Sequence, residues 1–492
     1  MKNQIFLAVA CIFMTSTSFA NNLVMGTPTV NGSSVSFTIK WDNSWYVTTG
    51  PSNWDAVWVF IKRQNCDQPN QNPWIHANLA ANGHSVSGSQ LQVDLASDNK
   101  GVFIRRSSTG IGNITQVTVT LTLAAAINSD NIGVYGIEMV NVPEGQFYIG
   151  DGVTSNFNNR NGWESTFSDG NTTNPKLITQ AIDNAGIGLN SAYVRNGNGS
   201  TVSLPNTFPL GYKRFYCMKY EISNAQYVGF LNTLTYNQQL HRQQENNWNT
   251  TPPTSSSGTS FMENWGYKIV IKTPGISTTS LTPAVYACDA NANGVFDEDC
   301  DGLSFPVSLG LDHWLAYLDW SALRPMTEFE YEKACRGPLQ PVQNEFAWGT
   351  TDLSNDYNEL NWKCNNEIPQ NFRLGLSNYV TGKVHRAGME ATATSDRVHA
   401  GATYYGILNM TGGMIERCVG GGGYDYSTFT TANGDGNLTS FGNTDMTVWN
   451  AMSFFNRGAS LQRGESSKLS ERWWGNDNSY GNAISGRGVR SY

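Results

Sequence analysis

Hydrophobic and polar residues alternate along two stretches near the start of the chain, residues 35–41 and 117–123. A period of two residues is typical of strands that bury one face. Between these stretches, residues 56–61 form a nearly continuous apolar run, which also predicts a strand. Dipeptides that favour turns accompany the runs: Asn31-Gly32 and Ser87-Gly88. The pattern predicts a small all-β sandwich over residues 21–134.

Tryptophan is concentrated in this predicted sandwich, at positions 41, 45, 54, 58 and 74. Large aromatic side chains are usually buried, so we expect most of these rings in the core. The alternative is that some of them form an exposed face that docks a sugar or a protein.

Residues 135–492 form the second predicted domain, in which two helix starts have a clear signature. Ser223 precedes Gln226 by three residues, and Thr327 precedes Glu330 in the same way, so each pair can form a capping box. A further helix is predicted over residues 311–323. The rest of the domain is rich in Gly, Asn, Thr and Ser, which predicts long ordered loops.

The first 20 residues have the pattern of a secretory signal. Lys2 precedes an apolar run, and small residues end the segment at Ala20. We therefore expect the protein to be exported to the periplasm, the cell surface or the medium. A lipoprotein signal ending at Cys11 is the alternative. No later stretch has the roughly 18 apolar residues of a transmembrane segment.

The charge of the chain disfavours two classes of partner. Its formal net charge is −8 and no basic cluster occurs along it, whereas nucleic acid and anionic lipid both require a concentrated basic surface. Aromatic residues reach 12% and glycines number 49, which favours β-rich or loop-rich extracellular architecture over a helical bundle.

The cysteines of the chain permit disulfides, but their number does not determine which of them pair. The chain has eight cysteines, and removal of Cys11 with the signal would leave an odd number, so at least one thiol stays free or pairs between chains. No CxxC pair occurs. Cys288 and Cys300 bracket one short loop and are the first pair we expect to bond.

Six segments of the second predicted domain carry motifs that occur together in one protein family. They are Ile137–Gly150, Phe215–Phe230, Arg324–Gly337, Phe346–Gly349, Tyr405–Glu416, and Phe455–Ser460 together with Gly486–Arg490. In this order the segments resemble the formylglycine-generating-enzyme (sulfatase-modifying factor) family. The resemblance covers about residues 136–492 and implies that family's C-type-lectin-like α+β fold. The predicted fold class is therefore α+β, preceded by the sandwich.

The resemblance implies a calcium site in the glycine-rich segment. In the family an asparagine, backbone carbonyls and a glutamate hold the ion, and hard oxygen ligands suit Ca²⁺. The alternative is that the glutamate only binds loop amides. The matching residues here are Asn409 and Glu416, with Thr411, Gly412 and Met414 as carbonyl donors.

The family's redox chemistry is not expected here. Its formylglycine-forming members bind copper through two cysteines that follow the strand matching Phe455–Ser460, and residues 460–467 contain none. Related sulfoxide synthases bind iron through a histidine triad. The six histidines of this chain show no pair at ligand spacing. Neither copper nor iron is therefore predicted.

A second calcium site is predicted directly from residue spacing. Oxygen ligands alternate along residues 289–297, and the sixth position is Gly294, as an EF-hand-type loop requires. Cys300 replaces the glutamate of the twelfth position, between Asp299 and Asp301. A solvated acidic turn is the alternative. The predicted ligands are Asp289, Asn291, Asn293, Val295 and Asp297.

Three functions remain open on these grounds. The leading hypothesis is an exported, calcium-stabilised, non-catalytic module that binds a glycan or protein of the cell envelope or has a structural role there. The second is a metal- and oxygen-dependent oxidase with a relocated metal site around Cys335 or Cys418. The third is a variable ligand-binding face within residues 433–480. Fold resemblance alone transfers no activity.

Overall fold

The computed structural model describes a large part of the chain. The predicted signal sequence lies outside that part, as does most of the stretch from 459 to 483. The described residues are 22–67, 72–127, 130–151, 175–179, 194–195, 201–202, 208–245, 251–264, 267–278, 280–353, 359–369, 383–392, 395–420, 429–449, 454–458, 467–470, 474–475 and 484–492.

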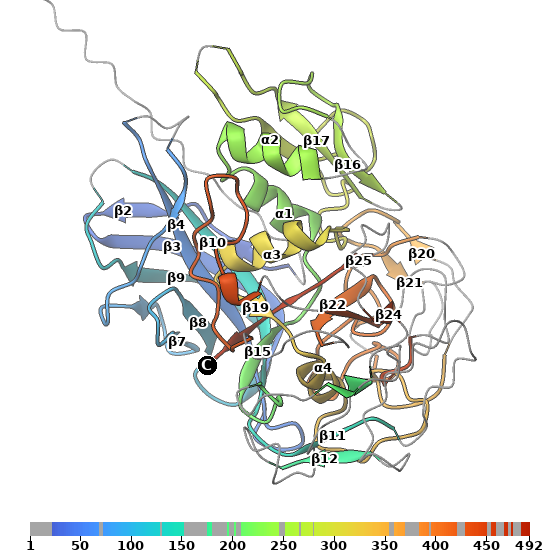
Figure 1. The fold of residues 1–492 in the computed structure, drawn as a ribbon. Coiled ribbons are helices and arrows are strands. Elements are labelled where there is room, and N and C mark those ends of the chain that lie inside the picture. The colour runs from blue at the N-terminus through green and yellow to red at the C-terminus, as the bar shows by residue number, and fades with distance from the viewer. Residues whose placement is uncertain are drawn as a thin grey trace, which may run out of the picture.

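A large antiparallel sheet runs through the middle of the molecule (Figure 1). Its strand order is β19-β26-β15-β10-β4-β8-β7, and β5 pairs with β4 beside this path. The strands are β4 (Asp55–Asn65), β5 (Ile75–His76), β7 (Leu91–Leu95), β8 (Val102–Arg106), β10 (Asp130–Val142), β15 (Phe215–Met218), β19 (Arg324–Pro325) and β26 (Gly488–Ser491).

A second sheet covers one half of the central sheet. It has the order β1-β3-β9-β6, with β2 paired to β3. The alternating run 35–41 lies in β3, and the run 117–123 lies in β9 up to residue 122. These two strands pair along most of their length. The strands are β1 (Val24–Met25), β2 (Thr29–Asn31), β3 (Ser34–Tyr46), β6 (Ser85–Val86) and β9 (Gly110–Thr122).

The position of β4 between two hydrophobic clusters explains why its sequence is apolar at successive positions. Val57, Val59 and Ile61 pack with the second sheet in one hydrophobic cluster. Trp58 and Phe60, at the positions between, pack in another cluster with residues of helices α1 (Asn224–Leu231) and α3 (Leu311–Trp320). A strand that is buried on both faces has no polar side to alternate.

Strand β10 joins the two halves of the chain. Residues 130–140 pair with β4, and residues 139–142 pair with β15 on the other side. The boundary predicted between residues 134 and 135 falls inside this strand.

Four α-helices are described, together with several small sheets. In Figure 1, α2 and the sheet β16-β17-β18 lie at the top of the view, away from the sheet β22–β25. None of the described helices combines the length and apolar character needed to cross a membrane. The helices are α1 (Asn224–Leu231), α2 (Tyr236–Glu245), α3 (Leu311–Trp320) and α4 (Glu328–Arg336). The remaining strands are β11 (Phe147–Ile149), β12 (Lys176–Ile178), β13 (Val194–Arg195), β14 (Thr201–Val202), β16 (Ser260–Asn264), β17 (Tyr267–Thr273), β18 (Val285–Cys288), β20 (Glu359–Leu360), β21 (Ile368–Pro369), β22 (Ile415–Val419), β23 (Phe454–Arg457), β24 (Trp474–Gly475) and β25 (Ile484–Ser485).

Both predicted capping boxes are confirmed. Ser223 begins α1 and Thr327 begins α4, and in each the hydroxyl and the side chain three residues later bind each other's backbone amides. Helix α3 ends at Trp320 rather than at residue 323, because Ala322 adopts a left-handed conformation with φ 55°. Helix α2 was not predicted, because its sequence is almost entirely polar.

The predicted α+β fold class is wrong. Strands hold 35% of the described residues and helices 11%, and the strands form several largely antiparallel sheets. The helix caps are strong local signals, yet the helices they start are only 8 and 9 residues long. The segments rich in glycine and asparagine contain short strands, whose pairing depends on residues far away in the sequence.

The tryptophans of the N-terminal half are less buried than expected. Trp41 and Trp58 are fully buried, whereas Trp45, Trp54 and Trp74 are half-buried, so the expectation of core positions fails for these three. Two of the half-buried rings contact cations. The guanidinium groups of Arg105 and Arg214 lie 4.6 and 4.8 Å from the Trp54 ring, and the Lys219 ammonium lies 4.8 Å from Trp45.

Two glycine substitutions test the packing of the central sheet. A Cβ at Gly101 would lie 2.5 Å from the Val59 carbonyl oxygen and 2.6 Å from the Trp58 ring, so Gly101→Ala should destabilise the protein by about 1–3 kcal/mol. Gly229→Ala is the control, because its Cβ would meet only Tyr135, at 3.6 Å, inside a helix. Urea denaturation measures both. Equal stabilities for the two variants would contradict this account of the sheet.

Candidate metal sites

The loop that follows β18 has the predicted EF-hand-like course. The Asn291 Oδ1 accepts a hydrogen bond from the Asn293 amide at 2.9 Å, and the Asn293 Oδ1 accepts one from the Val295 amide at 2.7 Å. Gly294 has φ 79°, a conformation that glycine adopts without strain. The side-chain oxygens therefore follow one another around a tight turn.

The two aspartates of the predicted ligand set differ in what they bind. Asp289 is buried, and its Oδ1 is 3.5 Å from the Gly294 amide. Asp297 accepts a hydrogen bond from the Cys288 amide at 2.9 Å and forms a 3.2 Å ion pair with Lys272. Asp297 is thus already engaged by a donor and a cation.

Asp301 is the residue of this loop that the predicted ligand set missed. It is 0% exposed, and its Oδ2 accepts a hydrogen bond from the Glu298 amide at 2.8 Å. Its Oδ1 has no hydrogen-bond partner among the described residues. Burial raises the pKa of this carboxyl to about 6, and the negative charge of Asp289 adds to the rise. Its place beside the twelfth loop position was the one signal in the sequence.

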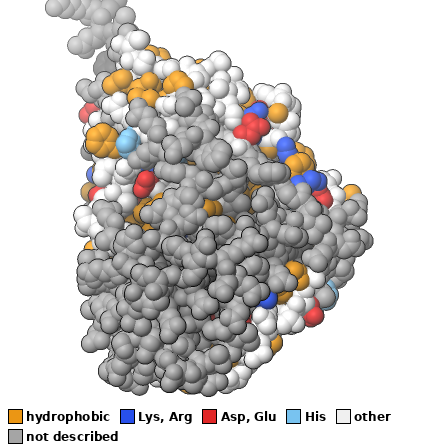
Figure 2. Space-filling model, turned by 45° about the vertical axis from the view of Figure 1, so that its right-hand side comes forward, with side chains coloured by type: hydrophobic (Ala, Val, Ile, Leu, Met, Phe, Trp, Pro, Cys, Tyr) orange, Lys and Arg blue, Asp and Glu red, His pale blue; other side chains and the backbone are white. Residues whose placement is uncertain are grey.

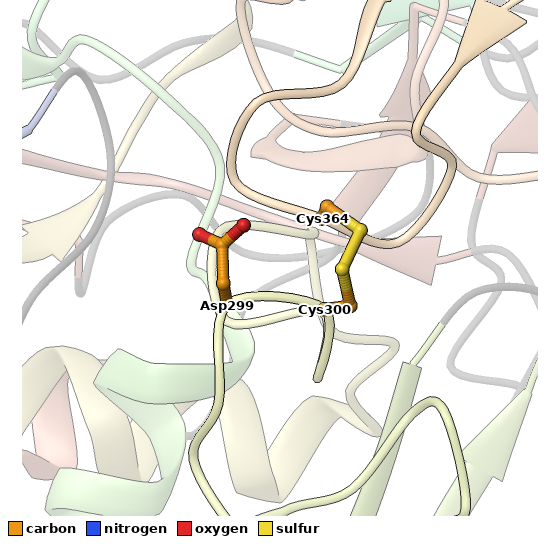
Figure 3. Close-up of side chains that lie close together, drawn as sticks. All are labelled: Asp299, Cys300 and Cys364. Atoms are coloured by element: carbon orange, nitrogen blue, oxygen red, sulfur yellow. A yellow bond between two sulfur atoms is a disulfide. The ribbon is translucent and has the colours of Figure 1, made fainter.

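The disulfide expected between Cys288 and Cys300 does not form. Cys300 bonds to Cys364, which is 64 residues away, and not to Cys288 (Figure 3). Cys288 ends β18, and its thiol is free and buried in the hydrophobic core. Asp299 lies within 4.8 Å of both bonded sulfurs. Because thiolates, not disulfide sulfurs, ligate metals, these three residues do not form a site in the oxidised protein.

The glycine-rich segment places Glu416 in a buried ion pair. Arg487 donates two hydrogen bonds to its carboxylate, from Nε to Oε2 at 2.7 Å and from Nη2 to Oε1 at 2.5 Å. Asn409 accepts a hydrogen bond from the Gly388 amide at 2.7 Å. Thr411 binds the Ala347 amide through its hydroxyl. All three predicted side chains therefore have partners within the protein.

Glu221 is a second carboxylate at this segment that sequence reasoning missed. Its Oε1 accepts a hydrogen bond from the Met414 amide at 2.8 Å, and its Oε2 has no partner among the described residues. Burial, and then the nearby charge of Glu416, raise the pKa of Glu221 well above its usual value. Two buried carboxyls thus share one guanidinium. The amide of Gly412 binds the Gly458 carbonyl, which fixes the middle of the segment.

A third acidic cluster joins the end of α3 to the segment 434–446. Oxygens of Asp319, Asp435 and Asp445 lie within 4.8 Å of one another. Asp319 accepts hydrogen bonds from the amides of Asp435 and Asp445, at 3.0 and 3.1 Å, and from the Thr444 hydroxyl at 2.7 Å. The buried Lys62 donates to the Gly436 carbonyl. These contacts form a clamp that fixes the segment, although burial lowers the pKa of Lys62 well below its usual value.

Figure 2 shows one face of the molecule, on which acidic and basic side chains of the described residues adjoin in some places and acidic side chains stand singly in others. No protein-family model matches the chain, and no curated protein is significantly similar to it in sequence.

The buried ion pair at Glu416 should be important for stability. Arg487→Met leaves two buried carboxyls, Glu416 and Glu221, without a cation, and should destabilise the protein by about 3–5 kcal/mol. Arg63→Met removes a half-exposed partner of Asp130 and should change stability by less than about 1 kcal/mol. Chemical denaturation compares the two. A loss below that of Arg63→Met would contradict a structural role for the pair.

The clamp at Asp319 should make stability depend on pH. Burial, aided by Asp435 and Asp445, raises the pKa of Asp319 to about 7, so the folded protein holds a proton that the unfolded chain releases at lower pH. The contribution of Asp319 to stability should therefore fall as pH rises from 5 to 8. Asp319→Asn cannot lose this proton, so its melting temperature should fall less over that range. Parallel curves for the two proteins would count against the mechanism.

Proposed function

We propose that the protein is an exported, calcium-stabilised, non-catalytic module that binds an envelope component or has a structural role at the cell surface. The observation that carries this proposal is the loop from Asp289 to Asp301. In this loop the side-chain oxygens of Asn291 and Asn293 follow one another at alternate positions. The loop ends at the buried carboxylate of Asp301, whose Oδ1 has no hydrogen-bond partner among the described residues.

The charge of this loop favours a divalent cation. Five acidic residues lie in it, and two lysines contact it: Lys272 at Asp297, and Lys363 at the Ala290 carbonyl. Ca²⁺ accepts six to eight oxygen ligands in flexible geometry, which suits such a loop. The acidic residues are Asp289, Asp297, Glu298, Asp299 and Asp301.

The calcium predicted at the glycine-rich segment stays a prediction. Arg487 already neutralises Glu416, and the Asn409 side chain is engaged by Gly388. A cation there would have to use the free oxygen of Glu221 and backbone carbonyls. For this reason we assign the stabilising ion first to the Asp289 loop.

Two arguments support the role as a binding or structural module. The first is the family resemblance, which we propose on the basis of the six motifs. The second is the environment of the cysteines. Cys335 and Cys418 were the positions considered for a relocated metal site. Both are fully buried, and burial raises the pKa of each thiol well above its usual value. A protonated thiol is a poor ligand for copper, so the oxidase alternative gains no support from these residues.

The surroundings of Trp54 bear on the kind of envelope component that is bound. A sugar-docking face would need open aromatic rings, and guanidinium groups already lie against the Trp54 ring. The proposed ligand is a glycan or a protein, and Trp54 is not assigned to a sugar-docking face.

Metal analysis of the purified mature protein tests the proposal. We expect bound calcium by mass spectrometry, a melting temperature several degrees lower after chelation, and recovery when calcium is added back, because a ligand that binds only the folded state stabilises it. Stoichiometric copper or iron, or a melting temperature that chelation leaves unchanged, would contradict it.

A further inference from the structure

We propose that the carboxylate of Asp301 is the closing ligand of the calcium site in the Asp289 loop, and that the Cys300–Cys364 disulfide holds this ligand in place. The proposal rests on the calcium binding proposed above and deepens it, by naming a ligand that EF-hand spacing does not supply and a covalent bond on which the affinity depends.

The position of Asp301 differs from that of its neighbours. It is fully buried, and Asp289, the first residue of the loop, is buried as well. The Glu298 amide donates to its Oδ2, whereas Oδ1 is buried and has no close hydrogen-bond partner among the described residues. The backbone amide of Asn291, inside the loop, also acts on this carboxyl. Asp299 is exposed, and Asp297 is paired with Lys272. Asp301 thus stands one residue beyond the position where the usual glutamate closes the loop.

The disulfide fixes the end of the loop against a second segment. On one side of the bond the Asn365 amide donates to the Asp299 carbonyl, and on the other the Gly302 amide donates to the Lys363 carbonyl, both at 3.0 Å. Figure 3 shows the two chain segments that the bond joins. The residue beside Asp301 therefore has little freedom to leave the site.

Calcium affinity and the redox state of this disulfide should consequently be linked. Dithiothreitol transfers two electrons and two protons to the bond, giving two thiols and its own cyclic disulfide. Reduction frees the chain next to Asp301 and should weaken calcium binding. By the same thermodynamic cycle, bound calcium should make the disulfide harder to reduce.

Calcium titration of the full mature chain by calorimetry tests the ligand. Asp301→Asn should weaken binding by about tenfold or more, since affinity in such loops depends on the number of charged ligands. Asp299→Asn is the matched control and should change affinity by less than about threefold. Asp289→Asn assigns the measured binding to this loop. Melting curves in chelator show whether each variant folds.

The outcomes separate this inference from the function it rests on. If the wild-type chain binds no calcium, both fail. If Asp289→Asn abolishes binding while Asp301→Asn behaves as Asp299→Asn does, the calcium site stands and Asp301 is not its ligand.

A second titration tests the disulfide. The wild-type chain after reduction, and the double variant Cys300→Ser with Cys364→Ser, should both bind calcium at least about fivefold more weakly than the oxidised chain. Calcium should also slow reduction by dithiothreitol, measured by thiol release. Equal affinities in the oxidised and reduced proteins would overturn the proposed role of the bond.

Discussion

Burial of the central sheet on both faces is the constraint on which the rest of the structure depends. One face of β4 packs against the second sheet, and the other against α1 and α3. Strand β10 carries the same sheet from the N-terminal half to the strands β15, β26 and β19. Because the sheet is continuous through β10, the two halves of the chain share backbone hydrogen bonds, which ties them more firmly than contact between separately folded units would.

Local patterns predicted the elements well, and distant pairings could not be predicted. Alternation in residues 35–41 and the capping boxes at Ser223 and Thr327 involve neighbours only, and each has its counterpart in the structure. The fold class failed because it depends on strands such as β15, which pairs with residues 139–142 on one side and with residues 489–491 on the other. Helix α2 escaped prediction because its buried positions include the polar Gln239 and Arg242, which give no apolar period.

In the candidate sites, too, the local features could be predicted from the sequence and the distant partners could not. The spacing of residues 289–297 identifies a loop because its geometry is local, and the structure shows the expected turn there. The partners that complete each site come from elsewhere in the chain. Cys364 bonds to Cys300 across 64 residues, and Arg487 reaches Glu416 across 71. Glu221 binds the Met414 amide across 193 residues. No spacing rule in a single sequence relates such positions.

The position of β26 has a consequence for how the chain folds during its synthesis. This strand lies between β15 and β19, and its Arg490 binds Asp98 from near the start of the chain. The ribosome therefore releases residues 488–491 after nearly all their neighbours, and until then one edge of β15 has no partner. Such late, long-range closure slows folding and leaves an open strand edge for other chains to pair with. Until β26 pairs, the nascent chain is therefore prone to aggregate through the open edge of β15.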